Sequence, residues 1–202
     1  MAHCLSCHSY VLYESSTCAS CTDKGNNLRV VRDDLPETYG PQKKEWNFRY
    51  KMIKGKIAET LIEQLFLSHK YTVYRYGMEY TLQGFAESMR GLECDTADRI
   101  RNMPDFVVQH RQYKDTYFVE VKFRANGCFS EAELYKNYPY DNALIIVVSK
   151  QHIKCLSVRE LREGQEISPA CRNYLADRPE FQLRKDVVID FCRFAVTFFE
   201  GV

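Results

Sequence analysis

The sequence lacks a long hydrophobic run, a secretion signal and a strong net charge. No stretch of about eighteen consecutive apolar residues occurs, which argues against a transmembrane helix, and no membrane partner is expected. The first ten residues, MAHCLSCHSY, lack the basic and then apolar pattern of a signal peptide, so we expect a cytoplasmic protein. The net charge is only +1 at pH 7, which excludes a polycation whose whole surface attracts nucleic acid.

The charge is nevertheless uneven along the chain. Residues 42–56, QKKEWNFRYKMIKGK, contain six Lys or Arg and one Glu, a local charge of +5 that leaves −4 on the rest. Such a basic segment on a nearly neutral body suits an anionic polymer better than a small metabolite. An ordinary solvated surface is the plainer alternative.

The nine cysteines are odd in number, and without an export signal they argue against a disulfide framework. Four of them form the pattern C-x2-C-x10-C-x2-C, which supplies four thiolates for a tetrahedral zinc ion: Cys4, Cys7, Cys18 and Cys21. Because four thiolates close the coordination sphere, we assign this structural Zn²⁺ to folding and docking. A redox pair, free thiols, or a ligand replaced by His3 or His8 are the alternatives.

Composition divides the chain into three regions. Residues 1–27 are too poor in large aliphatic side chains to build their own core, so a small zinc-ribbon-like module is expected there. Residues 28–45 contain two prolines and a glycine and are predicted to be a linker. Residues 46–202 have the pattern of one compact α/β domain, a mixed central sheet flanked by helices.

The expected elements of that domain follow from hydrophobic periodicity. A helix is predicted over 46–69, and its projection places Glu59 at the border of the buried face and Glu63 farther out. A helix or loop is expected over 83–101, a short helix capped by Ser130 over 130–137, and a helix over 185–200 that covers the sheet. Runs of β-branched and aromatic residues predict strands at 71–77, 105–110, 116–124, 143–149 and 152–158.

The two middle strands, in PDFVVQHRQYKDTYFVEVKFR (104–124), each carry an acidic residue near one end, Asp105 and Glu120. Because side chains alternate along a strand, Glu120 and Lys122 share one face, and pairing of the two strands brings Asp105 to Glu120. Two carboxylates and a backbone carbonyl such as that of Val121 are hard oxygen donors that suit Mg²⁺ or Mn²⁺. Lys122 is then placed to orient a water or to stabilise the charge of a reacting phosphate.

These residues resemble the signature of the PD-(D/E)XK nuclease superfamily, which includes restriction endonucleases and Holliday junction resolvases. Pro104-Asp105 is followed, after fourteen residues, by Glu120-Val121-Lys122. The segment GKIAE (55–59) is similar to the G-x-x-x-E opening of resolvase-like members. The predicted element order over residues 50–150 also resembles the core of that superfamily. The four-cysteine segment has no counterpart in that core and is expected to be an appended module.

The resemblance implies a restriction-endonuclease-like fold and metal-dependent hydrolysis of phosphodiesters, most naturally in DNA. Asp105 and Glu120 are then metal ligands, Lys122 the catalytic lysine and Glu59 a helper from the helix. Arg124, Gln109 and Tyr135 are expected neighbours of the site. Members that cut two strands act as symmetric dimers, so a homodimer is compatible with the resemblance.

Two other functions are compatible with the same residues. Glu120 and Lys122 form a simple surface ion pair in the plainest alternative, worth under about 1 kcal/mol. The protein is then a non-catalytic nucleic-acid-binding or assembly protein on a nuclease-like scaffold. A zinc-organised protein-interaction factor is the third hypothesis.

Overall fold

The computed structural model describes residues 2–3, 10–11, 40–81, 88–89, 91–135 and 137–200, and the chain divides into two compact units, Met1–Lys44 and Glu45–Val202. In the first unit, β1 (Ala2–His3) pairs antiparallel with β2 (Tyr10–Val11). The four cysteines of the expected zinc module lie outside the described residues, so that module stays a prediction.

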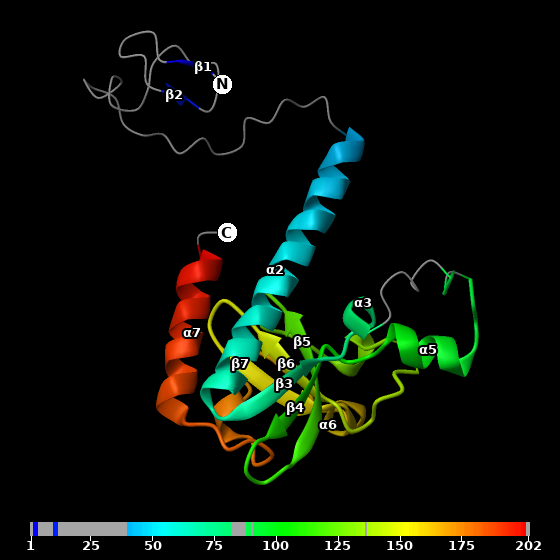
Figure 1. Ribbon diagram of the computed structural model, residues 1–202, viewed down its shortest axis with the longest axis vertical. Coiled ribbons are helices and arrows are strands. Elements are labelled where there is room, and N and C mark those ends of the chain that lie inside the picture. Colours follow the sequence, from blue (N-terminus) through cyan, green and yellow to red (C-terminus); the bar gives the residue numbers. More distant parts are fainter. Residues whose placement is uncertain are drawn as a thin grey trace. The chain divides into compact units, whose positions relative to one another are not determined.

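The second unit is built on a five-stranded mixed sheet in the order β3-β4-β5-β6-β7 (Figure 1). Neighbouring strands are antiparallel except for the parallel pair β5 and β6. This confirms the α/β class and the mixed central sheet, and every predicted strand is present with slightly shorter bounds. The strands are β3 (Tyr71–Arg75), β4 (Phe106–His110), β5 (Thr116–Phe123), β6 (Leu144–Val148) and β7 (Ile153–Ser157).

Hydrophobic cores cover both faces of this sheet. Alternate residues of β6 enter different cores: Ile146 packs with α2 (Gly40–Ser68) and α7 (Lys185–Glu200), and Ile145 packs with α6 (Val158–Arg162). Figure 1 shows α2 and α7 over the same face. Burial on both faces explains why β6 is a continuous apolar run, and the predicted covering role of the C-terminal helix is confirmed.

The long helix α2 carries the apolar stripe that its sequence predicts. Its C-terminal half is anchored in the core by five buried side chains: Ala58, Leu61, Ile62, Leu65 and Phe66. The helix begins earlier than expected. Residues 40–45, which were predicted to be the end of the linker, form its first turns. Toward its N-terminus the side chains of Trp46 and Phe48 are exposed, since they extend past the stripe that contacts the sheet.

The short helix predicted over 130–137 forms only in part. Ser130 is the N-cap, as expected, but the helix is a single 3₁₀ turn, η1 (Glu131–Glu133), in which the Ser130 amide donates to Glu133 Oε2 at 3.2 Å. The turn ends because Leu134 is extended and Asn137 has a left-handed φ of 62°, neither of which continues a helix. Three short helical elements are also present: α3 (Met78–Thr81), α5 (Asp95–Arg101) and η2 (Leu175–Asp177).

Candidate active site

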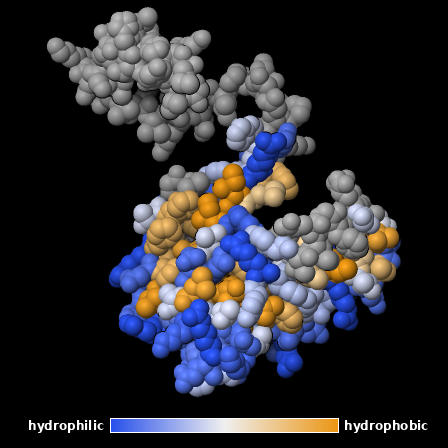
Figure 2. All heavy atoms as spheres, in the orientation of Figure 1, coloured by the Kyte–Doolittle hydropathy of each residue, from blue (hydrophilic) through white to orange (hydrophobic). Residues whose placement is uncertain are grey.

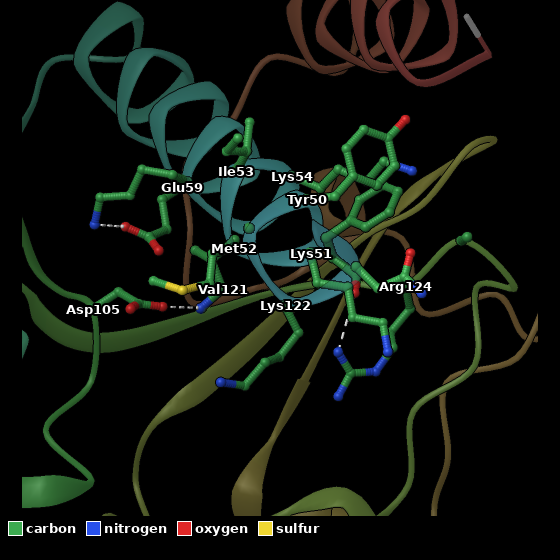
Figure 3. A pocket seen from close by; sticks show the side chains of 15 residues that line it. Tyr50, Lys51, Met52, Ile53, Lys54, Glu59, Asp105, Val121, Lys122 and Arg124 are labelled. Carbon is green, nitrogen blue, oxygen red and sulfur yellow. Dashed lines mark hydrogen bonds and ion pairs between the residues drawn. The ribbon is translucent and has the colours of Figure 1, made fainter. Parts of the chain in front are cut away.

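The register of β4 and β5 brings Asp105 and Glu120 together. The last paired residues of the ladder are Phe106 and Val119, so the next position on each strand faces the other. The Asp105 amide donates to Glu120 Oε2 at 3.3 Å, and the Val121 amide donates to Asp105 Oδ2 at 2.7 Å (Figure 3). Both carboxylates are therefore held by the backbone at the open end of the hairpin.

The backbone of Val121 also places a carbonyl on the β4 side of β5. Within a strand, the N–H and C=O of one residue point to the same side. Because the Val121 N–H reaches Asp105, its carbonyl points to that side as well, beyond the end of β4. Val121 lines the adjoining cavity together with Asp105.

Lys122 lies beside the carboxylates as a cation. Its Nζ forms an ion pair with Glu120 Oε1 on the same face of β5. Burial acts to lower the pKa of Lys122, but the negative charges of Glu120 and Asp105 outweigh it, and the pKa is raised above its ordinary value. In the metal-free protein Lys122 therefore carries a positive charge beside the carboxylates at neutral pH.

Asp105 lies in a crowded acidic environment. Burial first, and then the negative charges of Glu120 and Glu59, raise the pKa of Asp105 well above its ordinary value. The Val121 amide and the Lys122 ammonium offset only part of this effect. Carboxylates that repel one another in a partly dry site gain stability from a positive ion, and carboxylate and carbonyl oxygens suit Mg²⁺ or Mn²⁺. The donor set therefore fits the expected ion.

Glu59 reaches this group from α2. Its side chain is only 16% exposed and accepts a hydrogen bond of 2.6 Å from Lys56 Nζ. Figure 3 shows Glu59 on the helix and Asp105 on the strand at the same side of the cavity. Its position at the border of the buried face is as predicted from the projection of the helix. Gly55, one turn earlier, has open space around the position of a side chain.

A cavity of about 1270 Å³ opens between α2 and the end of β5, with Asp105, Glu59 and Lys122 in its wall. Basic side chains form much of the remaining wall: Lys51, Lys54, Lys56 and Arg124. The three lysines belong to the basic segment 42–56. The positive charge of that segment therefore lines the same cavity as Asp105 and Glu59. Lys54 Nζ also lies 4.1 Å from the centre of the Tyr50 ring, an aromatic residue of the same wall.

A second cavity of about 490 Å³ adjoins Glu120. Glu120 and Lys122 are in its wall, and Lys122 lines both cavities. Tyr138 is buried in this wall, and burial first, and then the charges of Glu120 and Asp105, raise the pKa of its phenol well above the ordinary value. Tyr138 could not be singled out from the sequence, because its place beside Glu120 depends on how the chain packs after β5.

Two of the three expected neighbours lie in these walls. Arg124 lines the larger cavity and Tyr135 the smaller one. Gln109 does not take part: it lies toward the far end of β4, where its Nε2 donates to Thr116 Oγ1 at 3.0 Å. Asp105 precedes the first residue of β4, whereas Gln109 lies near its last residue, so the two side chains are at opposite ends of the strand.

The expectation for Glu63 was wrong. It was placed farther from the buried face than Glu59, yet its side chain is 15% exposed and forms an ion pair with Arg75 on β3. A projection of α2 considers only the residues of that helix. It therefore could not predict that Arg75, on β3, covers Glu63. Glu63 is not part of either cavity wall.

Within the described ranges, no three His, Cys, Asp or Glu side chains group as a metal site. The expected magnesium set has only two such side chains and a carbonyl, so its assignment stays a prediction. Among the helices that the structure describes, none is long and apolar enough to cross a membrane. Comparison with family models, with curated proteins and with solved structures finds no match to this chain.

Proposed function

We propose that this protein is a metal-dependent nuclease that hydrolyses phosphodiester bonds in DNA, with a restriction-endonuclease-like domain of the PD-(D/E)XK type. The observation that carries the proposal is the group formed by Asp105, Glu120 and Lys122 at the end of the β4–β5 hairpin, with Glu59 facing it from α2. The element order α2, β3, β4, β5, β6 agrees with that core. The single turn η1 departs from it, since a longer helix is expected there.

Asp105, Glu120 and the Val121 carbonyl would hold Mg²⁺ or Mn²⁺. Such an ion, when bound, supplies Lewis-acid polarisation of the phosphate and activates a water molecule. Asp105 and Glu120 contribute by fixing the oxygen donors on two hydrogen-bonded strands, which costs little reorganisation during the reaction. Glu59 holds Lys56 near the site and adds negative charge next to Asp105.

Lys122 stabilises the negative charge that develops on the phosphate oxygens as the phosphodiester is attacked. Its place in the walls of both cavities lets the ammonium meet a substrate that crosses from one to the other. The ion pair with Glu120 aims the ammonium at the carboxylates before substrate arrives.

The larger cavity supports a nucleic acid as the substrate. Lys51 and Lys54 present positive charge to a phosphodiester backbone beside the carboxylates. Exposed aromatic side chains on the same stretch of α2, Trp46 and Phe48, offer flat surfaces on which bases can stack. Figure 2 shows hydrophobic surface next to hydrophilic surface along α2. A structural zinc module, expected at the N-terminus, would assist in binding substrate or partner.

The alternative is a non-catalytic nucleic-acid-binding or assembly protein on the same scaffold. One observation favours it: both Glu120 oxygens already accept hydrogen bonds, from Lys122 Nζ and from the Asp105 amide. In that case the basic cavity binds nucleic acid, and the Glu120–Lys122 pair is structural.

A cleavage assay over several DNA shapes separates the two functions. Supercoiled, single-stranded and four-way-junction DNA would be incubated with the wild type and Glu120→Gln in Mg²⁺, in Mn²⁺ and in EDTA. The proposal predicts metal-dependent cleavage of at least one shape and a loss of at least about 100-fold in Glu120→Gln. Asp190→Asn, which changes an exposed carboxylate on α7, is the matched control and keeps full activity. Binding without cleavage in every condition would support the alternative.

A further inference from the structure

The hydroxyl of Tyr138 is buried and has no hydrogen-bond partner among the described residues. The residue is only 5% exposed. A buried polar group left unpaired costs stability, and the large majority of such groups in proteins are paired. An unpaired phenol therefore calls for a specific explanation.

Other tyrosines of the domain do find partners. The Tyr140 hydroxyl donates to the Arg99 carbonyl at 3.1 Å, and the Tyr71 hydroxyl accepts from the Gln182 amide at 3.0 Å. Tyr138 is also held firmly by its backbone, since its amide donates to the Tyr135 carbonyl at 3.0 Å and its own carbonyl accepts from Arg162 Nη2 at 2.7 Å. Its position is thus fixed, and the missing partner is a property of the place it occupies.

That place is the wall of the smaller cavity, next to the proposed catalytic group. Glu120 and Lys122 are in the same wall, and the charges of Glu120 and Asp105 are felt at the phenol. A volume of about 490 Å³ lies within the usual range of small-molecule sites. A ligand that enters this cavity therefore comes to Tyr138, Glu120 and Lys122 together.

The remaining wall indicates the chemistry of that ligand. Arg101 supplies a guanidinium, held by Asp98 Oδ1 at 3.0 Å, and Tyr135 supplies an aromatic side chain that is half exposed. Glu133, the other carboxylate of the wall, is neutralised by Arg124 Nε at 2.8 Å. The two basic side chains of the wall are also ion-paired, Arg101 with Asp98 and Lys122 with Glu120, so the wall carries no excess of either charge. What it offers a ligand is an exposed ring, an unpaired hydroxyl donor and two cations that can share a further anion, which suits a phosphate ester that carries a flat base.

We infer that this cavity, bounded by Arg101, Tyr135 and Tyr138, is the subsite for one nucleotide of the substrate beside the scissile bond, in which the Tyr138 hydroxyl donates a hydrogen bond to a phosphate oxygen. The inference rests on the proposed nuclease function in taking that phosphate to be part of the substrate. Tyr138 is then a binding and positioning residue. Bound nucleotide supplies the partner that the protein lacks.

The test compares Tyr138→Phe with Tyr140→Phe. Binding of deoxyadenosine 5′-monophosphate would be followed by NMR titration with and without Mg²⁺, alongside kcat and KM for DNA cleavage and the melting temperature. We expect Tyr138→Phe to bind the nucleotide about 10-fold to 100-fold more weakly and to lose kcat/KM by a similar factor. It should melt at the wild-type temperature or above it, because an unpaired hydroxyl has been removed. Tyr140→Phe should keep binding and kcat/KM but melt lower, because a paired hydroxyl has been lost.

The outcomes separate this inference from the proposed function. A wild type that cleaves DNA, with nucleotide binding and cleavage unchanged in Tyr138→Phe, overturns the subsite and leaves the nuclease standing. A wild type that cleaves no DNA but binds the nucleotide through Tyr138 overturns the nuclease, and it supports nucleotide binding in this cavity without a scissile bond beside it. No nucleotide binding by the wild type, or a Tyr138→Phe protein that loses binding together with thermal stability, overturns the subsite.

Discussion

The Val121 amide donates a hydrogen bond of 2.7 Å to Oδ2 of Asp105, across the end of the β4–β5 hairpin. This bond fixes one oxygen of the Asp105 carboxylate. It also holds that carboxylate beside Glu120, whose negative charge repels that of Asp105. The two carboxylates are therefore held together at a cost in stability when no metal ion is bound. Positions of this kind are expected where function and stability conflict.

Replacing Asp105 with Asn should therefore stabilise the metal-free protein. The amide oxygen of Asn still accepts from Val121, while the repulsion from Glu120 and Glu59 is removed. We expect the melting temperature in EDTA at neutral pH to rise by about 2–4 °C, the shift that about 1 kcal/mol gives in a chain of this size. A lower melting temperature would contradict the strained environment assigned to Asp105.

The same substitution has a pH dependence of known sign. The native pKa of Asp105 is raised, so protonation stabilises the wild type at low pH, and that stabilisation is lost as the pH rises through the native pKa. Near and below pH ~4, where an unperturbed Asp also protonates, the two proteins should differ least. The advantage of Asp105→Asn should grow toward neutral pH, as measured by circular dichroism melts in EDTA. An advantage that shrinks with rising pH would have the wrong sign.

Period-two geometry predicted the meeting of Asp105 and Glu120, because the hairpin register depends only on local alternation and pairing. The border position of Glu59 was predictable for a similar reason, since one helix face determines it. Glu63 and Tyr138 were not, because each depends on a segment packed from elsewhere: β3 supplies Arg75, and the chain after β5 carries Tyr138 to Glu120. Non-local packing of this kind leaves no periodic trace.

The charge of Lys122 should be required for cleavage. Lys122→Met keeps much of the length of the side chain but removes the ammonium, so we expect kcat to fall by about 100-fold or more. Lys122→Arg should retain part of the activity because it keeps the charge. Lys185→Met, at an exposed lysine of α7, is the control. Full activity of Lys122→Met in a steady-state cleavage assay would exclude the assigned role.

The basic wall of the larger cavity should set the salt dependence of binding. Replacing Lys51 and Lys54 with Gln removes two positive charges from the wall of the larger cavity, where we propose that DNA binds. Fluorescence anisotropy should show weaker binding to all DNA sequences, and the slope of log K against log salt should become shallower by about 0.7–0.9 for each lost contact. Arg193→Gln, on an exposed part of α7, should leave the slope unchanged. An unchanged slope in the double variant would remove this cavity from the DNA interface.

The four-cysteine pattern predicts one structural zinc ion per chain. Cys4→Ser should lose that zinc, measured by elemental analysis of the purified protein, because a four-thiolate site tolerates loss of a ligand poorly. Cys94→Ser changes an exposed cysteine outside the pattern and should retain it. Retention of a full equivalent of zinc by Cys4→Ser would show that Cys4 is not a required ligand.

The claim that Asp105 and Glu120 form a divalent-metal site is tested most directly by titration with Mn²⁺, followed by electron paramagnetic resonance. The wild type, Asp105→Asn, Glu120→Gln and the Asp190→Asn control would be compared after removal of other metal ions that compete with Mn²⁺ for the site. We predict one Mn²⁺ per chain in the wild type and in Asp190→Asn, and a loss of this binding in both site variants. Undiminished Mn²⁺ binding by Asp105→Asn and Glu120→Gln, or none by the wild type, would contradict the account.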